Sequence, residues 1–148
     1  MEGLIITYGD GIQTLPAQFQ EKLLSAFSHF LEVAKFETTV GLHFVGSAEM
    51  QRLNLEYRDK DKPTDILSFT YGKGEEQLGD LALCLEVAEA QATQNEWDTQ
   101  TEVVRLMAHG FTHLLGYDHE TSEEEREMIE VEIRLLKSCG LIDIYPQE

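Results

Sequence analysis

The chain has 148 residues, a length typical of one domain around a single hydrophobic core, so we expect residues 1–148 to form one domain. Its apolar runs are short and its N-terminus has no basic segment leading into a long apolar one, which argues against a membrane span or a signal peptide and for a cytoplasmic location. With 28 acidic and 11 basic residues its formal net charge is −17, which argues against broad nonspecific binding to nucleic acid.

The first part of the chain has the patterns of two strands and two helices. Residues 4–8 read as a short strand, and residues 16–34 as an amphipathic helix whose apolar side chains recur at three- and four-residue steps. Residues 38–45 are β-branched and alternating, which predicts a strand. Ser47 then offers a cap for a short helix that ends near Tyr57.

The middle of the chain predicts two more strands and a third helix. We expect strands at 64–71 and 79–85, a flexible loop at 72–77 between them, and a helix at 86–95. With two further helices downstream, the elements predict an α+β fold in which a small mixed four-stranded sheet packs with about five helices.

Two capping boxes are expected to open the last two helices. Thr99 with Glu102 opens a helix that is apolar on nearly all faces and should run through the interior, with one polar strip for its histidines. Ser122 with Glu125 opens the final helix. The acidic run at 120–132 is therefore expected to be a helix surface rather than a cluster of catalytic carboxylates.

Three of the five histidines lie close together near the end of the interior helix. His109 and His113 are four residues apart, so on a helix their imidazoles share one face and can bind one cation together. Gly116 can end the helix in a left-handed conformation and bring His119 round as a third ligand. Three imidazoles match a catalytic Zn²⁺ site with one open position, since structural zinc sites usually have four ligands rich in thiolate.

The spacing of these histidines is also that of the metzincin proteases, which carry a glutamate base after the first histidine. Here that residue is Gly110, which cannot accept a proton, so peptide hydrolysis lacks its usual base. Asp118 is a candidate partner for an imidazole N–H, or else a replacement base. The isolated His29 and His43 are interpreted as ordinary packing or surface residues.

Basic residues are concentrated in one short segment, where four of the eleven fall within eleven positions. Such a group can bind phosphate locally on an acidic protein. The alternative is a solvated turn with charges of both signs, since Glu56, Asp59 and Asp61 lie in the same segment. The candidate phosphate-binding residues, and so candidates for binding a nucleic acid such as RNA, are Arg52, Arg58, Lys60 and Lys62.

Three segments together resemble the YbeY family of bacterial endoribonucleases: HGFTHLLGYDHE from His109, LNLEYRDKDKPTDILSF at 53–69 and LGDLALC at 78–84. The resemblance implies a zincin-like fold, one Zn²⁺ held by the three histidines, a cytoplasmic location and action on ribosomal RNA and on defective small ribosomal subunits. It implies that the arginine of the family's Y-R-x-K-D run is Arg58 in this chain. Two positions depart from the common pattern, Thr70 where proline is frequent and Thr112 where leucine is frequent, and neither is a ligand or a charged group.

We therefore expect a zinc-dependent, single-strand-specific endoribonuclease that acts in maturation of the 3′ end of small-subunit ribosomal RNA and in ribosome quality control. Arg58 and His113 are the expected catalytic residues, with Arg58 contacting nonbridging phosphate oxygens. The resemblance also implies partners such as a small-subunit ribosomal protein or a ribosome-associated GTPase. Two alternatives remain: a different hydrolase on the same metal scaffold, with Asp118 or Glu120 as base, and a non-catalytic ribosome-assembly factor with a structural zinc.

Overall fold

A mixed sheet of four strands forms the centre of the fold in a computed structural model that describes residues 3–142. The strand order is β1-β2-β4-β3; the first three of these are parallel, and β3 is antiparallel to β4 at one edge. The strands are β1 (Gly3–Tyr8), β2 (Thr39–Val45), β3 (Ile66–Thr70) and β4 (Gln77–Cys84).

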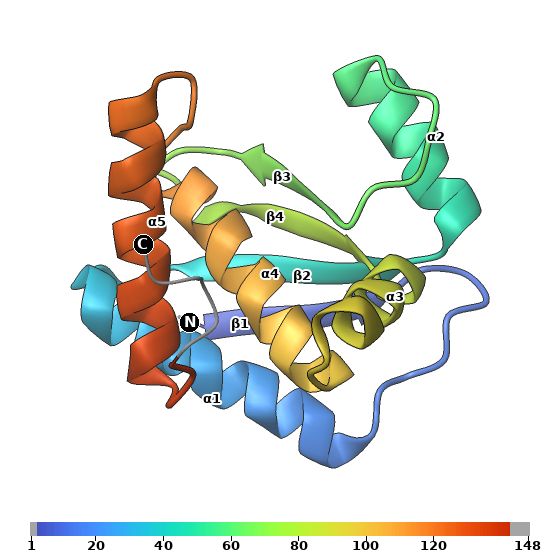
Figure 1. The fold of residues 1–148 in the computed structure, drawn as a ribbon, viewed down its shortest axis with the longest axis horizontal. Helices are drawn as coiled ribbons and strands as arrows, with labels where there is room; N and C mark the ends of the chain where they lie inside the picture. Colours follow the sequence, from blue (N-terminus) through green and yellow to red (C-terminus); the bar gives the residue numbers. More distant parts are fainter. Residues whose placement is uncertain (1–2, 143–148) are drawn as a thin grey trace.

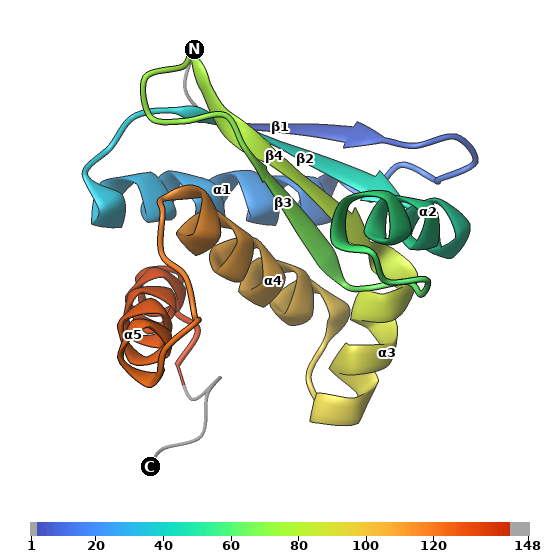
Figure 2. The same ribbon diagram turned by 90° about the horizontal axis from the view of Figure 1, so that it is seen from above.

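Five helices in residues 3–142 pack with this sheet (Figure 1). They are α1 (Ala17–Ala34), α2 (Ser47–Arg58), α3 (Leu85–Asn95), α4 (Thr99–Leu114) and α5 (Ser122–Ser138). Helices α1, α4 and α5 lie together on one side of the sheet (Figure 2). Helix α2 lies apart from them, at the end of the molecule opposite to α5. The expected α+β class, with a small mixed four-stranded sheet and five helices, is confirmed. None of the helices in the described range is long and apolar enough to cross a membrane.

The main core lies between the sheet and helices α1, α4 and α5. Leu42, Leu81 and Leu83 point into it from alternate positions of β2 and β4, as the two-residue period of a strand requires. Phe27 of α1 packs edge-on against Phe111 of α4, with ring centroids 5.2 Å apart. Each such fully buried side chain stabilises the fold by about 1.5–3 kcal/mol. A smaller cluster on the other side of the sheet holds α2.

Helix α4 runs through the interior, as its sequence predicts. Its positions from Val103 to Phe111 are mostly buried, and it comes so close to the sheet that residue 110 must be very small. A Cβ atom added to Gly110 would lie 2.7 Å from a methyl carbon of Leu81 and 3.1 Å from one of Ile66. A glutamate at position 110 would therefore have to displace the buried ends of Leu81 and Ile66, so this packing disfavours a metzincin base there.

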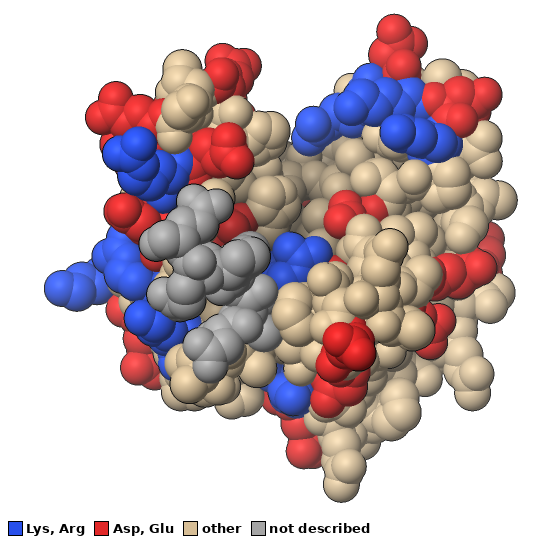
Figure 3. Space-filling view, viewed as in Figure 1, with Lys and Arg blue, Asp and Glu red and all other residues tan. Residues whose placement is uncertain are grey.

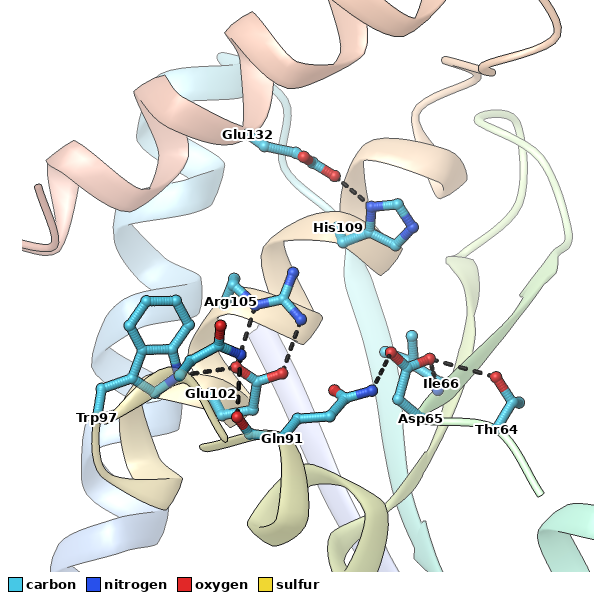
Figure 4. Close-up of polar contacts among 10 residues, drawn as sticks. Thr64, Asp65, Ile66, Gln91, Trp97, Glu102, Arg105, His109 and Glu132 are labelled. Atoms are coloured by element: carbon cyan, nitrogen blue, oxygen red, sulfur yellow. Dashed lines mark hydrogen bonds and ion pairs between the residues drawn. The ribbon is translucent and has the colours of Figure 1, made fainter. Parts of the chain in front are cut away.

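The start of α4 corrects one expectation. The N-cap is Asp98, not Thr99: Asp98 has extended backbone angles, and its Oδ1 accepts a 2.7 Å hydrogen bond from the Thr101 backbone N–H. Glu102 is not part of a capping box. It is fully buried, and its carboxylate accepts hydrogen bonds from the Trp97 indole and the Arg105 guanidinium (Figure 4).

Two other caps are also one residue earlier than expected. The N-cap of α2 is Gly46, with Ser47 as the first helical residue. The capping box of α5 is formed by Thr121 and Glu124, whose side chains and backbone N–H groups bond reciprocally, rather than by Ser122 and Glu125. Where several capping residues are adjacent, the sequence does not say which one keeps extended backbone angles.

Candidate metal centre and nucleic-acid interface

The structure brings together the three histidines that the sequence singles out. His109 and His113 lie one turn apart on α4, with ring centroids 4.8 Å apart. After the helix ends, Gly116 has a φ of +106°, a conformation that side-chain-bearing residues rarely adopt, and the chain turns back there. This turn places the ring of His119 5.3 Å from that of His113.

The spacing and chemistry of these rings fit one zinc ion. With Zn–N bonds of ~2.1 Å and tetrahedral angles, the centroids of two zinc-bound imidazoles are separated by about 5 Å. The two measured separations match this value. As placed within residues 3–142, however, His, Cys, Asp and Glu side chains do not form a group of three or more that could hold a metal. The rings therefore have the right spacing, and zinc binding requires them to reorient until one nitrogen of each faces a common point.

A buried carboxylate on another helix already holds one of these rings. Nδ1 of His109 is hydrogen-bonded to Oε1 of Glu132, which projects from α5 and is only 3% exposed (Figure 4). A carboxylate on one imidazole nitrogen fixes the ring orientation and leaves the other nitrogen, Nε2, for a metal. The sequence interpretation treated residues 120–132 as a helix surface, and for Glu132 this is wrong. A signal was present, since Glu132 lies four residues after the buried Met128 on the apolar side of α5.

The second histidine is held in its metal-binding form. Burial lowers the pKa of His113 below its ordinary value of 6.5, and the positive charges that His109 and His119 would carry lower it further. A neutral imidazole has a free lone pair, whereas a protonated one cannot bind a cation. At neutral pH His113 is therefore an available donor.

The remaining candidates near the histidines lie in the exposed turn. Oδ1 of Asp118 accepts a 2.8 Å hydrogen bond from the backbone N–H of His119, so in this structure the carboxylate shapes the turn. For His109 the contact at an imidazole nitrogen is made by Glu132, and a contact of Asp118 with another of the imidazoles stays a prediction. Asp118 and Glu120 are both exposed and stay candidates for a base.

The candidate phosphate-binding group lies at the end of α2 and in the turn after it. Arg58 is the last residue of α2 and is exposed. The turn is tied back to the helix because the buried Asn54 donates a 2.9 Å hydrogen bond to the Lys62 carbonyl, and Gln51 donates one of the same length to Asp61. These contacts restrain the turn, whose residues 55–63 are all exposed, so the phosphate-binding role of Arg58, Lys60 and Lys62 and the solvated turn both remain open.

Charge is distributed unevenly around this side of the molecule. Lys and Arg side chains gather over the end of α2, across a hollow from the acidic N-terminal part of α5 (Figure 3). Within the α2 group, Arg52 differs from the others because Glu49 and Glu56 lie 3.7 and 3.4 Å from its guanidinium. Its charge is largely balanced there, which leaves Arg58, Lys60 and Lys62 as the stronger candidates.

Comparison with known proteins agrees with these features. The sequence profile described as Endoribonuclease YbeY matches residues 10–140. Endoribonuclease YbeY of Acinetobacter baylyi is 39% identical over 123 residues, 77% of this chain and 77% of that protein. The protein of the same name from Laribacter hongkongensis is 41% identical over 115 residues, 74% of this chain and 69% of that protein. The solution structure of TM1509 from Thermotoga maritima shares the fold, with a TM-score of 0.58 over 97% of this chain and 99% of that chain, at 21% identity. This chain therefore belongs to the YbeY family of endoribonucleases.

Proposed function

We propose that the chain is a zinc-dependent endoribonuclease that cleaves single-stranded RNA. The observation that carries the proposal is the set of three imidazoles around one glycine turn, spaced as ligands of one ion, in a member of an endoribonuclease family. The donors are all nitrogen, and three protein ligands would leave one coordination position open for chemistry.

Each residue of the site then has a defined task. His109, His113 and His119 hold the ion, which when bound supplies Lewis-acid chemistry at a phosphate oxygen or a water molecule. Glu132 accepts a hydrogen bond from the Nδ1–H group of His109, which favours the tautomer whose Nε2 is unprotonated. Arg58 donates charge-assisted hydrogen bonds to the nonbridging phosphate oxygens, where negative charge grows in the transition state. Asp118 or Glu120 takes up or releases a proton at its carboxylate oxygen.

The cellular role that we propose follows the family. The substrate is ribosomal RNA, with processing at the 3′ end of the small-subunit RNA and removal of defective small subunits. This role places the protein in the cytoplasm, in contact with the small subunit and with partners such as a ribosomal protein or a ribosome-associated GTPase.

Two variants separate metal binding from cleavage. His113→Ala should lose both the zinc and the cleavage of a single-stranded RNA, because one of three ligands is gone. Arg58→Glu should keep its zinc and lose activity on the order of 100-fold or more, as when a donor to a developing negative charge is removed. Zinc content is measured by mass spectrometry of the purified protein, and cleavage is measured on a labelled oligonucleotide.

His29→Ala is the matched control, because His29 lies on α1 away from the three clustered rings. It should keep both zinc and activity. Full cleavage by a zinc-free His113→Ala protein would contradict the proposal. Normal ribosome assembly in cells that carry zinc-loaded but inactive Arg58→Ala protein would instead favour the assembly-factor alternative.

A further inference from the structure

A cavity of about 540 Å³ lies next to the histidine turn and is lined by positive side chains. Lys35 reaches it from the end of α1, Lys73 from the loop between β3 and β4, and Arg134 from α5. Among residues 3–142, its lining includes no acidic residue. In a chain with 28 acidic and 11 basic residues, three cations from three separate elements facing one space is an unusual arrangement.

These three cations are available for a ligand. All three side chains are exposed, and within residues 3–142 none of them forms an ion pair with a carboxylate. Arg52 shows the contrast, since its guanidinium lies between two glutamates. An unpaired cation releases counterions when it binds a phosphate, and this release drives binding to nucleic acids.

The cavity also offers aromatic and apolar surface. Phe36 lines it, and the Lys73 ammonium lies 6.0 Å from the centre of the Phe36 ring. Tyr117 lines the same space from the turn after α4, and Val131 and Leu135 complete the apolar part. Proteins that bind single-stranded nucleic acid combine cations for the backbone with aromatic rings on which bases stack.

The position of the cavity connects it with the histidines. Gly116 and Tyr117 line it, and they lie between His113 and His119 in the turn that brings these two rings together. In both ribbon views the end of α1 and helix α2 lie at opposite ends of the molecule, with α4 between them (Figure 1, Figure 2). The end of α1, which borders the cavity, and helix α2, which ends at Arg58, therefore lie on opposite sides of α4, the helix that carries His109 and His113.

We propose that this cavity is a second subsite for single-stranded RNA, which binds a phosphate with Lys73 and Arg134 and stacks a base on Phe36 or Tyr117. It would hold the strand on the side of the histidines away from Arg58, so that both flanks of the cleaved bond are fixed. The inference rests on the proposed nuclease function for its ligand, and it concerns binding rather than cleavage.

The test compares two double variants with the same change in charge. Lys73→Gln/Arg134→Gln removes two cations of the cavity and spares Lys35, whose left-handed backbone could change the turn there. Lys22→Gln/Lys137→Gln removes two cations that do not line this cavity. Both proteins are zinc-loaded, and binding of a fluorescent 2′-O-methyl oligouridine of about 12 nucleotides is measured by anisotropy from 0.05 to about 0.3 M salt.

The cavity variant should bind on the order of 10-fold more weakly at 0.1 M salt than the wild type, and its log–log salt slope should be shallower by about 0.7, since the one phosphate bound by Lys73 and Arg134 contributes about 0.7 on a single strand. The control should retain most of the wild-type affinity and the wild-type slope. Equal affinity and equal slope for the two double variants would overturn the subsite. Cleavage of unmodified RNA by the wild type, measured separately, tests the nuclease function, so the two failures are distinguishable.

Discussion

Glu132 is the residue through which a second helix contacts the candidate metal centre. It is nearly fully buried, it comes from α5, and it bonds Nδ1 of His109 on α4. The local spacing of residues 109–119 was enough to predict which histidines would meet, because a helix turn and one glycine place them. The same spacing could not predict Glu132, because its approach depends on how α5 packs against α4.

We expect Glu132→Gln to weaken zinc binding about tenfold, the low end of the 10- to 100-fold range for partners of metal-bound histidines. Glutamine can still accept from Nδ1–H, but it has no charge to orient and polarise the ring. The measurement is competition for zinc with a chromophoric chelator at fixed pH.

Glu130→Gln is the control, because Glu130 is an exposed carboxylate on the same helix. Its zinc affinity should equal that of the wild type. If Glu132→Gln and Glu130→Gln bind zinc equally well, Glu132 does not position His109.

At the scale of elements, the strands and helices could be predicted from periodicity, and their exact starts could not. Within residues 3–142, the five helices and four strands appear close to the expected positions, because apolar repeats of two or of three to four residues are a strong signal. The predicted N-caps were each one residue too late. The observed caps of α4 and α5 are Asp98 and Thr121, and neighbouring Ser, Thr and Asp residues compete for this role. The cavity beside the turn brings together four segments and has no local signature at all.

The corrected cap of α4 gives a stability prediction. Asp98→Ala should lower the free energy of unfolding of the metal-free protein by about 1 kcal/mol, because the Thr101 backbone N–H loses its acceptor. Thr99→Ala, at the cap position that the sequence suggested, should change it much less. Urea denaturation at pH 7 measures both, and equal losses would contradict the assignment of the cap.

The pH dependence of the same contact has a defined sign. The Thr101 backbone N–H holds the pKa of Asp98 below its ordinary value of 3.8. The stabilisation is therefore fully present above pH ~3.8 and is lost as the pH falls through the lower folded-state pKa. The difference between wild type and Asp98→Ala should shrink correspondingly in acid.

At the scale of the whole molecule, a net charge of −17 and a nucleic-acid substrate are compatible because the charges are segregated. Acidic side chains are frequent at the N-terminal part of α5, while cations gather over the end of α2 (Figure 3). Three further cations line the cavity beside the turn. Composition alone gives the net charge, but it does not predict where the acidic and basic side chains lie, because that depends on the packing of distant segments.

The same excess of negative charge should make the metal-free protein more stable in salt. Like charges repel each other in the compact state, and the screening length shortens from about 30 Å at 0.01 M salt to below 8 Å at 0.3 M. We expect the urea midpoint to rise over this range. Sodium and potassium chloride should act alike if screening is the cause, and a midpoint that stays constant or falls would contradict it.

Because a residue of α5 is hydrogen-bonded to His109, we expect the docking of α5 and the binding of a metal at the histidines to be thermodynamically coupled. If zinc strengthens the docking of α5 by some factor, then by thermodynamic reciprocity the docking of α5 strengthens zinc binding by that same factor. Mutations on the apolar side of α5 that undock the helix would then lower the affinity for zinc, although they lie far from any ligand atom.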